Sequence, residues 1–326
     1  MNIDVKKITI IAVVFILLFS CSSAPKRPMS VTATADKAET LYKTANSELA
    51  AGMTENAGNH LDQAYTLALS IDNTDLLCKI MLSCITKELQ AQDGSPSGTG
   101  SIPAVSAGTR GTGPGIIHIG GNADGLLKAA RKAAARSAGR EKLEAVCSLY
   151  EARILLSKTA QTDTPDKNAA VHTLLDAQKT ILKNEPYYLA YLYVTKGDAY
   201  LLAGDYEGAA SCFETAAGIH TKNRYLQETG FDWYSAARAY SHAGNKNAAL
   251  SAIYKALAYD RDAENTAAIG ADYYAAALIL TKGTYSSKEK EQAVESAYRS
   301  SEIYQAGGFY ELAKKSFELA KKIGTE

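Results

Sequence analysis

A short repeated motif restricts the fold of this chain more than any other feature. Each copy starts with alanine and glycine, followed at fixed distances by an alanine, a large apolar residue and a second alanine. In the clearest copy, Ala203-Gly204 precedes Ala209, Phe213 and Ala216. The other copies start at Ala243-Gly244, at Ala306-Gly307-Gly308 and, more weakly, at Ala51-Gly52. Spacings of three and four residues favour one face of a helix, and repetition indicates an array of similar units.

An amphipathic pattern with small and aromatic residues precedes each clear copy. Gly197 and Tyr200 precede Gly204, and Trp233, Ala237 and Tyr240 precede Gly244. Small residues let two antiparallel helices approach closely, and large ones fill the groove between them. Glycine accepts the left-handed backbone of a helix C-cap at little cost. The pattern predicts antiparallel helical hairpins, with a generic helical bundle as the alternative.

These aromatic, small and alanine positions resemble those of the tetratricopeptide repeat (TPR). The resemblance covers residues 187–324 well and 38–70 weakly. Gly244 follows Gly204 by 40 residues and precedes Gly308 by 64, whereas the family repeats about every 34 residues. An extra helix from Asn265 to Lys282 is expected to fill the longer gap.

The predicted fold class is all-α: an irregular array of antiparallel helical hairpins, or TPR-like α-solenoid, over residues 37–326. Apolar periodicity predicts further helices at 74–91, 124–138, 140–159 and 168–184. Residues 93–123 differ, because they hold nine of the 24 glycines and three of the seven prolines. We expect them to form a flexible, Gly-rich insertion.

The N-terminal residues have the pattern of an export signal. Lys6 and Lys7 precede the apolar run Ile8 to Phe19, which is shorter than the roughly 20 residues of a spanning helix. The run ends in Leu18-Phe19-Ser20-Cys21, which resembles the lipobox of bacterial lipoproteins. That resemblance implies a signal peptide at 1–20, lipidation of Cys21 and a flexible tether over 21–36. The alternatives are a secretory signal cut after Ala24 and an uncleaved anchor.

Lipoprotein sorting rules, again by resemblance, connect Ser22 with an outer membrane and a domain facing the periplasm. The chain has 35 basic and 35 acidic residues, and a neutral balance argues against nucleic acid as a partner. Besides Cys21 the chain has four cysteines, for which buried, unpaired thiols are favoured over disulfides. They are Cys78, Cys84, Cys147 and Cys212.

Motifs for catalysis, cofactors and metals are missing from the sequence. The glycine-rich stretch at 108–121 has no Walker lysine. The five histidines have no partners at metal-ligand spacing. We therefore expect no catalytic residue, no metal and no cofactor, and the chain is not predicted to be an enzyme.

A basic stripe occurs on the helix predicted over 124–138. Lys128, Arg131, Lys132, Arg136 and Arg140 lie mostly four residues apart, so they share a helix face. Contact with anionic lipid or an acidic partner is one interpretation. The favoured one is a solvated face neutralised by carboxylates of neighbouring helices, such as Glu141 or Glu144.

The TPR resemblance also implies a concave groove lined by the first helix of each repeat, where a protein or peptide partner binds. The groove-facing positions carry over to three pairs of residues. They are Tyr191 and Asp198, Tyr234 and Arg238, and Tyr298 and Glu302. Tyrosine and arginine are common interface anchors, although packing against an adjacent helix explains these positions equally well.

The leading functional hypothesis is thus a membrane-tethered periplasmic scaffold for protein or peptide partners. The alternative is a ligand-handling accessory lipoprotein, such as an auxiliary component of a solute transporter. An enclosed apolar pocket, rather than an open groove, would favour that alternative.

Overall fold

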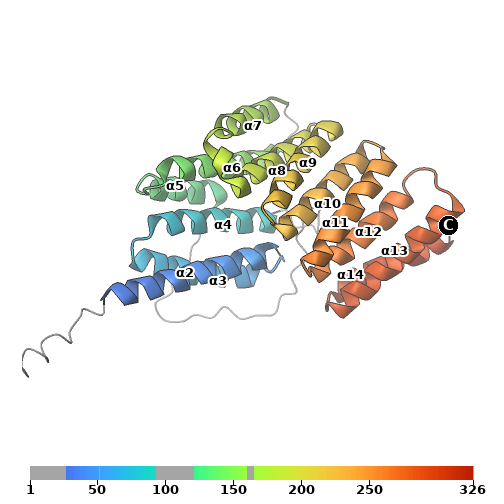
Figure 1. The fold of residues 1–326 in the computed structure, drawn as a ribbon, viewed down its shortest axis with the longest axis horizontal. Helices are drawn as coiled ribbons and strands as arrows, with labels where there is room; N and C mark the ends of the chain where they lie inside the picture. Colours follow the sequence, from blue (N-terminus) through green and yellow to red (C-terminus); the bar gives the residue numbers. More distant parts are fainter. Residues whose placement is uncertain (1–26, 51, 93–120, 160–164, 326) are drawn as a thin grey trace, which may run out of the picture.

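The computed structural model describes residues 27–50, 52–92, 121–159 and 165–325. Within these ranges the regular elements are helices and no strand occurs, so the predicted all-α class is confirmed (Figure 1). The helices are α2 (Arg27–Ala50), α3 (Thr54–Ser70), α4 (Thr74–Gln92), α5 (Ala123–Ala134), α6 (Arg140–Thr159), α7 (Pro165–Gln178), α8 (Pro186–Leu202), α9 (Tyr206–Lys222), α10 (Leu226–His242), α11 (Lys246–Asp262), α12 (Thr266–Leu280), α13 (Ser287–Ala306) and α14 (Tyr310–Thr325). A 3₁₀ turn, Ile181–Asn184, precedes α8.

Consecutive helices pair as hairpins, and the hairpins stack along one direction (Figure 1). Helices α2, α4, α6, α8, α10 and α12 form the first-helix row, in which α2 contacts α4, α4 contacts α6, α6 contacts α8 and α10 contacts α12. Their partners α3, α5, α7, α9, α11 and α13 form the second-helix row. This two-row arrangement is the predicted TPR-like α-solenoid.

The repeated alanine–glycine motif ends one helix and begins the next. Gly204 and Gly244 have φ angles of 77° and 79°, which confirms their predicted left-handed backbone. The Asp205 amide reaches back to the carbonyl of Tyr200 at 2.9 Å, which is the pairing of a Schellman cap. The side chain of Asp205 then accepts a hydrogen bond from the Gly208 amide at 2.9 Å, and so caps α9.

The predicted pairing of small and large residues joins α8 to α9. Ala209, Phe213 and Ala216 are fully buried. A Cβ atom at Gly197 would lie 2.7 Å from the Phe213 ring, a distance that normal packing does not tolerate. The absence of a side chain at Gly197 therefore admits this ring between the two helices.

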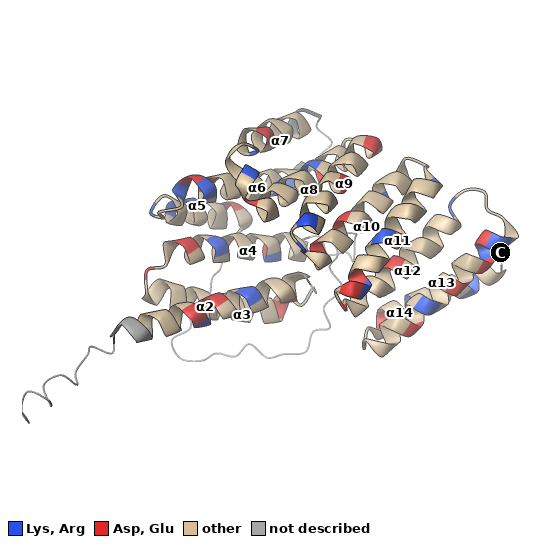
Figure 2. Ribbon diagram, viewed as in Figure 1, with Lys and Arg blue, Asp and Glu red and all other residues tan. Residues whose placement is uncertain are grey.

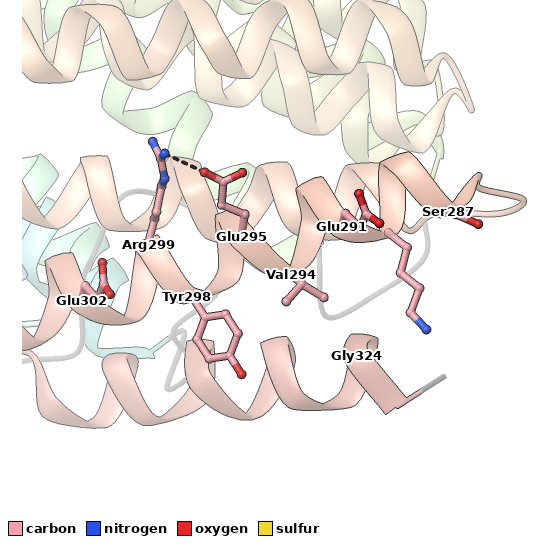
Figure 3. Close-up of a pocket in the computed structure, with 9 residues that line it drawn as sticks. Ser287, Glu291, Val294, Glu295, Tyr298, Arg299, Glu302 and Gly324 are labelled. Atoms are coloured by element: carbon pink, nitrogen blue, oxygen red, sulfur yellow. Dashed lines mark hydrogen bonds and ion pairs between the residues drawn. The ribbon is translucent and has the colours of Figure 1, made fainter.

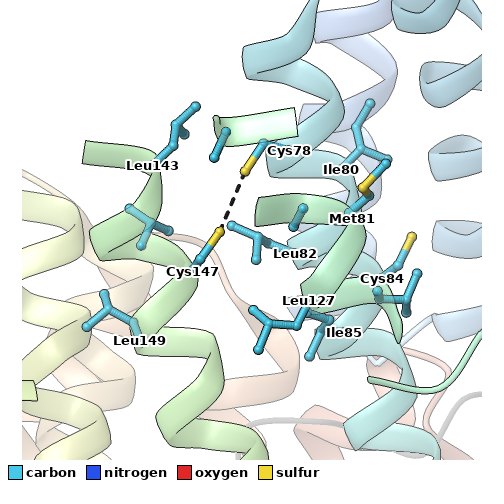
Figure 4. Packing of buried hydrophobic residues seen from close by; sticks show 14 of the residues in the cluster. Cys78, Ile80, Met81, Leu82, Cys84, Ile85, Leu127, Leu143, Cys147 and Leu149 are labelled. Carbon is cyan, nitrogen blue, oxygen red and sulfur yellow. Dashed lines mark hydrogen bonds between the residues drawn. The ribbon is translucent and has the colours of Figure 1, made fainter. Parts of the chain in front are cut away.

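Large aliphatic side chains and cysteines form the core of the N-terminal half (Figure 4). The Sγ atoms of Cys78 on α4 and Cys147 on α6 lie 3.9 Å apart, and both side chains are fully buried. Cys84 is also buried and Cys212 is half-buried, and all four are free thiols. Cys78, Cys84 and Cys147 thus occupy core positions, as expected of packing residues.

The C-terminal repeats have a different register from the one predicted. Helices α8, α10 and α12 begin 40 residues apart, at 186, 226 and 266. Helix α12 contacts α10 and α11, and the Ser300 hydroxyl of α13 donates to the carbonyl of Gly270 at 2.7 Å. Helix α12 is therefore the first helix of a hairpin that follows α8–α9 and α10–α11, with α13 as its partner, rather than an extra helix. The long connection at 281–286 moves the next alanine–glycine motif to the turn between α13 and α14.

The predicted boundaries need three corrections. The helix predicted over 124–138 is α5, which ends at Ala134, so Arg136 and Arg140 of the basic stripe lie beyond it. Helix α2 begins at Arg27, so residues 27–36 of the predicted tether 21–36 are helical. The helix predicted over 168–184 is α7, which ends at Gln178, followed by the 3₁₀ turn. Most of the predicted insertion 93–123, like Cys21, lies outside the described residues. None of the described helices has the length and hydropathy that a membrane span requires.

Candidate functional site

Four of the six predicted groove residues lie on neighbouring helices of the first-helix row. Tyr191 and Asp198 belong to α8, and Tyr234 and Arg238 belong to α10; all four are half-buried. Nη2 of Arg238 lies 3.9 Å from Oδ1 of Asp198. These two residues are 40 positions apart and occupy equivalent places in successive hairpins. The row thus presents tyrosine rings beside charges of both signs.

Helix α6 adds an arginine that the sequence interpretation missed. The guanidinium of Arg153 donates to the hydroxyl of Tyr191, and also to the hydroxyl of Thr86 on α4 at 3.2 Å. Its Cζ atom lies 5.3 Å from the centre of the Tyr191 ring and 5.8 Å from that of Tyr150, within the range of cation–π attraction. Arg153 therefore connects α4, α6 and α8.

We call Tyr150, Arg153, Tyr191, Asp198 and Arg238 the Arg153 cluster. Its setting limits access of water to the charged groups. Burial raises the pKa of Asp198 to about 6, although Arg238 and Arg153 act in the opposite direction. Burial also raises the pKa of the Tyr191 hydroxyl well above its usual value. At neutral pH the cluster therefore holds two guanidinium groups, one carboxylate and protonated tyrosines.

Two helices of the same row also carry exposed apolar side chains. Leu202 at the end of α8 is 46% exposed, and Leu278 of α12 is 45% exposed. Leu278 occupies the place that Asp198 and Arg238 have in the preceding hairpins, 40 residues apart. At this repeat position the row therefore changes from charged to apolar along the array.

Tyr298 and Glu302 lie elsewhere, which corrects the predicted groove. Both belong to α13 in the second-helix row (Figure 3). The centre of the Tyr298 ring lies 5.8 Å from that of Phe317 on α14, in an edge-on arrangement. The predicted register makes α13 the first helix of a hairpin, whereas it is the second helix of the α12–α13 hairpin. Tyr191 and Tyr234 are not equivalent either, since the residue 40 positions after Tyr191 is Phe231.

A recess of about 750 Å³ lies along α13. It is open to solvent, and the Arg299–Glu295 ion pair, at 2.6 Å, forms part of its wall (Figure 3). The lining residues are Ser287, Lys290, Glu291, Val294, Glu295, Tyr298, Arg299, Glu302 and Gly324.

Carboxylates neutralise part of the basic stripe, as the favoured interpretation predicted. Nη2 of Arg131 lies 2.7 Å from a carboxylate oxygen of Glu151, and its Nε lies 3.9 Å from Glu144. Arg136 pairs with Asp72, in the turn between α3 and α4, at 2.8 Å. Basic and acidic residues are accordingly mixed around α5 (Figure 2). In the described part of the chain, no group of three or more His, Cys, Asp or Glu side chains could hold a metal ion.

The sequence did contain a signal for part of the missed cluster. Tyr150 and Arg153 are three residues apart on one helix and so share a face. In the structure the ring centre of Tyr150 on α6 lies 5.9 Å from that of Tyr191 on α8. Their position outside the recognisable repeats concealed their relation to the row.

Comparison with known proteins identifies one repeat, in the α8–α9 hairpin. Residues 190–221, which cover most of α8 and all but the last residue of α9, match the family model described as tetratricopeptide repeat. The protein is TPR-like. No curated protein matches the chain by sequence. Among solved structures, the TPR-like chain is similar to the crystal structure of aspartyl phosphate phosphatase F from Bacillus subtilis. That likeness has 10% identity and a TM-score of 0.49, and it covers 92% of this chain and 73% of the other.

Proposed function

We propose that this protein is a membrane-tethered periplasmic scaffold that binds a protein or peptide partner on its first-helix row. The observation that carries the proposal is the set of half-buried tyrosines and arginines that α6, α8 and α10 bring together. Tyrosine and arginine contribute much of the energy of many interfaces, especially where neighbouring side chains restrict water. An extended peptide or a docked helix fits a row of this length and mixed polarity.

Arg238 provides a direct test of the binding surface. Replacing Arg238 with Ala should weaken partner binding by about 2 kcal/mol, or roughly 30-fold, if the row is the interface. The replacement should leave helicity and the melting temperature nearly unchanged, because the side chain is partly exposed. Recovery of a cross-linked partner from solubilised membranes, followed by titration of that partner, measures the effect.

Tyr254 is the matched control, since it is 49% exposed but lies on α11 in the second-helix row. The Tyr254→Ala variant should bind normally. Equal binding by the Arg238 and Tyr254 variants would place the interface outside the first-helix row.

Anchoring is proposed to depend on Cys21. Replacing Cys21 with Ala should abolish lipid labelling and release the protein from the membrane fraction, because stable attachment requires acyl chains. Growth with a radiolabelled or clickable fatty acid, followed by fractionation, measures both effects. A variant that remains in the membrane would refute lipid anchoring, and fractionation of the wild type tests the proposed outer-membrane location.

The alternative, an accessory lipoprotein that handles a small molecule, draws support from the recess on α13. Its volume of about 750 Å³ is typical of ligand pockets. The recess is open and has a charged wall, whereas small-molecule sites are usually enclosed and apolar. The function of the first-helix row is therefore the preferred proposal. Substitution of Val294 by Arg would fill the recess, so this alternative predicts that the variant loses ligand but keeps its protein partner.

A further inference from the structure

Cys78 and Cys147 are the cysteines of the described chain whose sulfurs meet. Cys78 lies on α4 and Cys147 on α6, and their Sγ atoms are 3.9 Å apart (Figure 4). Neither Cys84 nor Cys212 makes a hydrogen bond to another described cysteine. The two thiols are 69 positions apart in the chain, so the packing of α4 on α6 brings them together.

The core holds both sulfurs in this arrangement. Both cysteine side chains are fully buried, in a cluster that also contains Leu82, Leu143 and Leu149. A close-packed core leaves a side chain little room to move away, so each sulfur stays within reach of the other. Groups held together in this way react as if at very high concentration. The sulfurs must approach by about a further 2 Å to reach the roughly 2.05 Å of a disulfide bond.

Thiol–disulfide exchange supplies a balanced route to that bond. The thiolate of one cysteine attacks a sulfur of a disulfide oxidant, forms a mixed disulfide and releases one reduced thiol. The thiolate of the second cysteine then attacks the protein sulfur of the mixed disulfide, and the second reduced thiol leaves. The two cysteines lose two electrons and two protons, and the oxidant gains both. The required co-reactant is therefore a low-molecular-weight or protein disulfide.

Burial determines when this reaction can occur. The hydrogen bond between the two thiols and burial both raise the pKa of Cys78, so the folded protein holds little of the reactive thiolate at neutral pH. An oxidant also cannot reach sulfurs that are fully buried. We therefore expect the bond to form while the chain folds, before the core closes. The same core then shields the bond from reductants.

The bond would act on the part of the fold that positions the Arg153 cluster. Helices α4 and α6 contact each other, and Arg153 of α6 donates to the hydroxyl of Thr86 on α4 at 3.2 Å. Cys78 and Cys147 precede these two residues on the same two helices. A covalent bond between the cysteines restricts the unfolded chain and fixes α4 against α6.

We propose that Cys78 and Cys147 are a disulfide-forming pair, which ties α4 to α6 when the protein folds in the presence of a disulfide oxidant. The proposal goes beyond the proposed function, because it requires neither a binding partner nor attachment to a membrane. It assigns a modification site to two residues that otherwise serve only as core packing.

Oxidative refolding of the full chain tests the proposal. The detergent-solubilised protein is unfolded in guanidinium chloride with a reductant, then refolded with reduced glutathione alone or with a mixture of reduced and oxidised glutathione. Remaining thiols are alkylated, and non-reducing peptide mapping by mass spectrometry identifies linked cysteines whatever the state of Cys21. We expect most oxidatively refolded chains to contain a Cys78–Cys147 peptide pair that has lost two hydrogens. Their melting temperature should exceed that of the reduced protein by about 5 °C or more.

Alanine variants separate this pair from a general effect of oxidation. Cys78→Ala and Cys147→Ala should each lose the linked peptide and the oxidant-dependent rise in melting temperature. Cys84→Ala is the matched control, because Cys84 is buried on the same helix as Cys78, and it should keep both. If either of the first two variants fails to refold, the peptide map of the wild type still decides the pairing.

Two outcomes would overturn the proposal. One is oxidatively refolded protein in which Cys78 and Cys147 are both alkylated, or in which either is linked to a different cysteine. The other is a linked protein that melts no higher than the reduced one, since the native packing would then not accommodate the bond. Neither outcome concerns the binding surface, which Arg238→Ala tests separately.

Discussion

Replacing Phe213 with Ala should lower the free energy of unfolding by about 3–5 kcal/mol, the usual cost of truncating a buried phenylalanine. The ring is fully buried between α8 and α9, and it occupies the space that Gly197 leaves open. Two rigid helices cannot close such a cavity completely, so lost contacts add to lost apolar burial. Urea denaturation followed by circular dichroism measures the change.

Phe317 supplies the matched control, because it follows its own alanine–glycine motif but is 41% exposed on α14. The Phe317→Ala variant should lose less than about 1 kcal/mol, in keeping with surface substitutions. Similar losses for the two variants would contradict the assigned core of the α8–α9 hairpin.

Raising the pH should destabilise the array through the buried pair Asp260 and Asp272. These side chains lie on adjacent helices α11 and α12, and both are at most 2% exposed. Burial raises the pKa of both carboxyls, and the charge of Asp260 raises that of Asp272 further. Ionising both in place would cost on the order of several kcal/mol.

Proton linkage determines whether stability rises or falls with pH. Unfolded aspartates release their protons at about pH 4, whereas the folded pair retains a proton to higher pH. The stabilisation from this pair is therefore fully present at about pH 4 and below, and it is lost as the pH rises through the folded-state pKa values. Asp272→Asn should stabilise the protein at pH 8 and flatten its melting temperature between pH 5 and 9.

Asp262 is the control for this pair, because it is exposed on the same helix as Asp260. The Asp262→Asn variant should keep the wild-type pH dependence. If Asp272→Asn kept the same pH dependence as wild type, the two carboxyls would not share a buried site.

The features that sequence could predict are those set by local chemistry. Gly204 and Gly244 define helix ends because few other residues adopt their backbone. A glycine at 197 and a phenylalanine at 213 could be expected to pack together, because the ring needs the space that a missing side chain leaves. Such relations lie within about 20 residues and repeat, so both the hairpins and the all-α class could be predicted.

The register of the C-terminal hairpins and the members of the Arg153 cluster depend on contacts between residues far apart in the sequence, which no local pattern reveals. The motif at Gly308 resembles that at Gly204, yet the long connection after α12 changes its place in the array. Arg153 meets Tyr191 across 38 positions and a helix boundary, and its own helix lacks the motif. Hence the places of Tyr191, Asp198, Tyr234 and Arg238 on the row could be predicted, whereas the spacing of Tyr150 and Arg153 gave them a shared helix face but not their place beside Tyr191.

Site-specific photo-cross-linking of the full chain in intact membranes tests the central claim most directly. A photoreactive phenylalanine analogue would replace Leu278 on α12 or Tyr254 on α11. Both positions are exposed, so neither replacement should disturb packing, but they lie in different rows. The first-helix row is predicted to give a discrete protein adduct from position 278 and none from 254. An adduct from 254 alone would contradict the proposed binding surface.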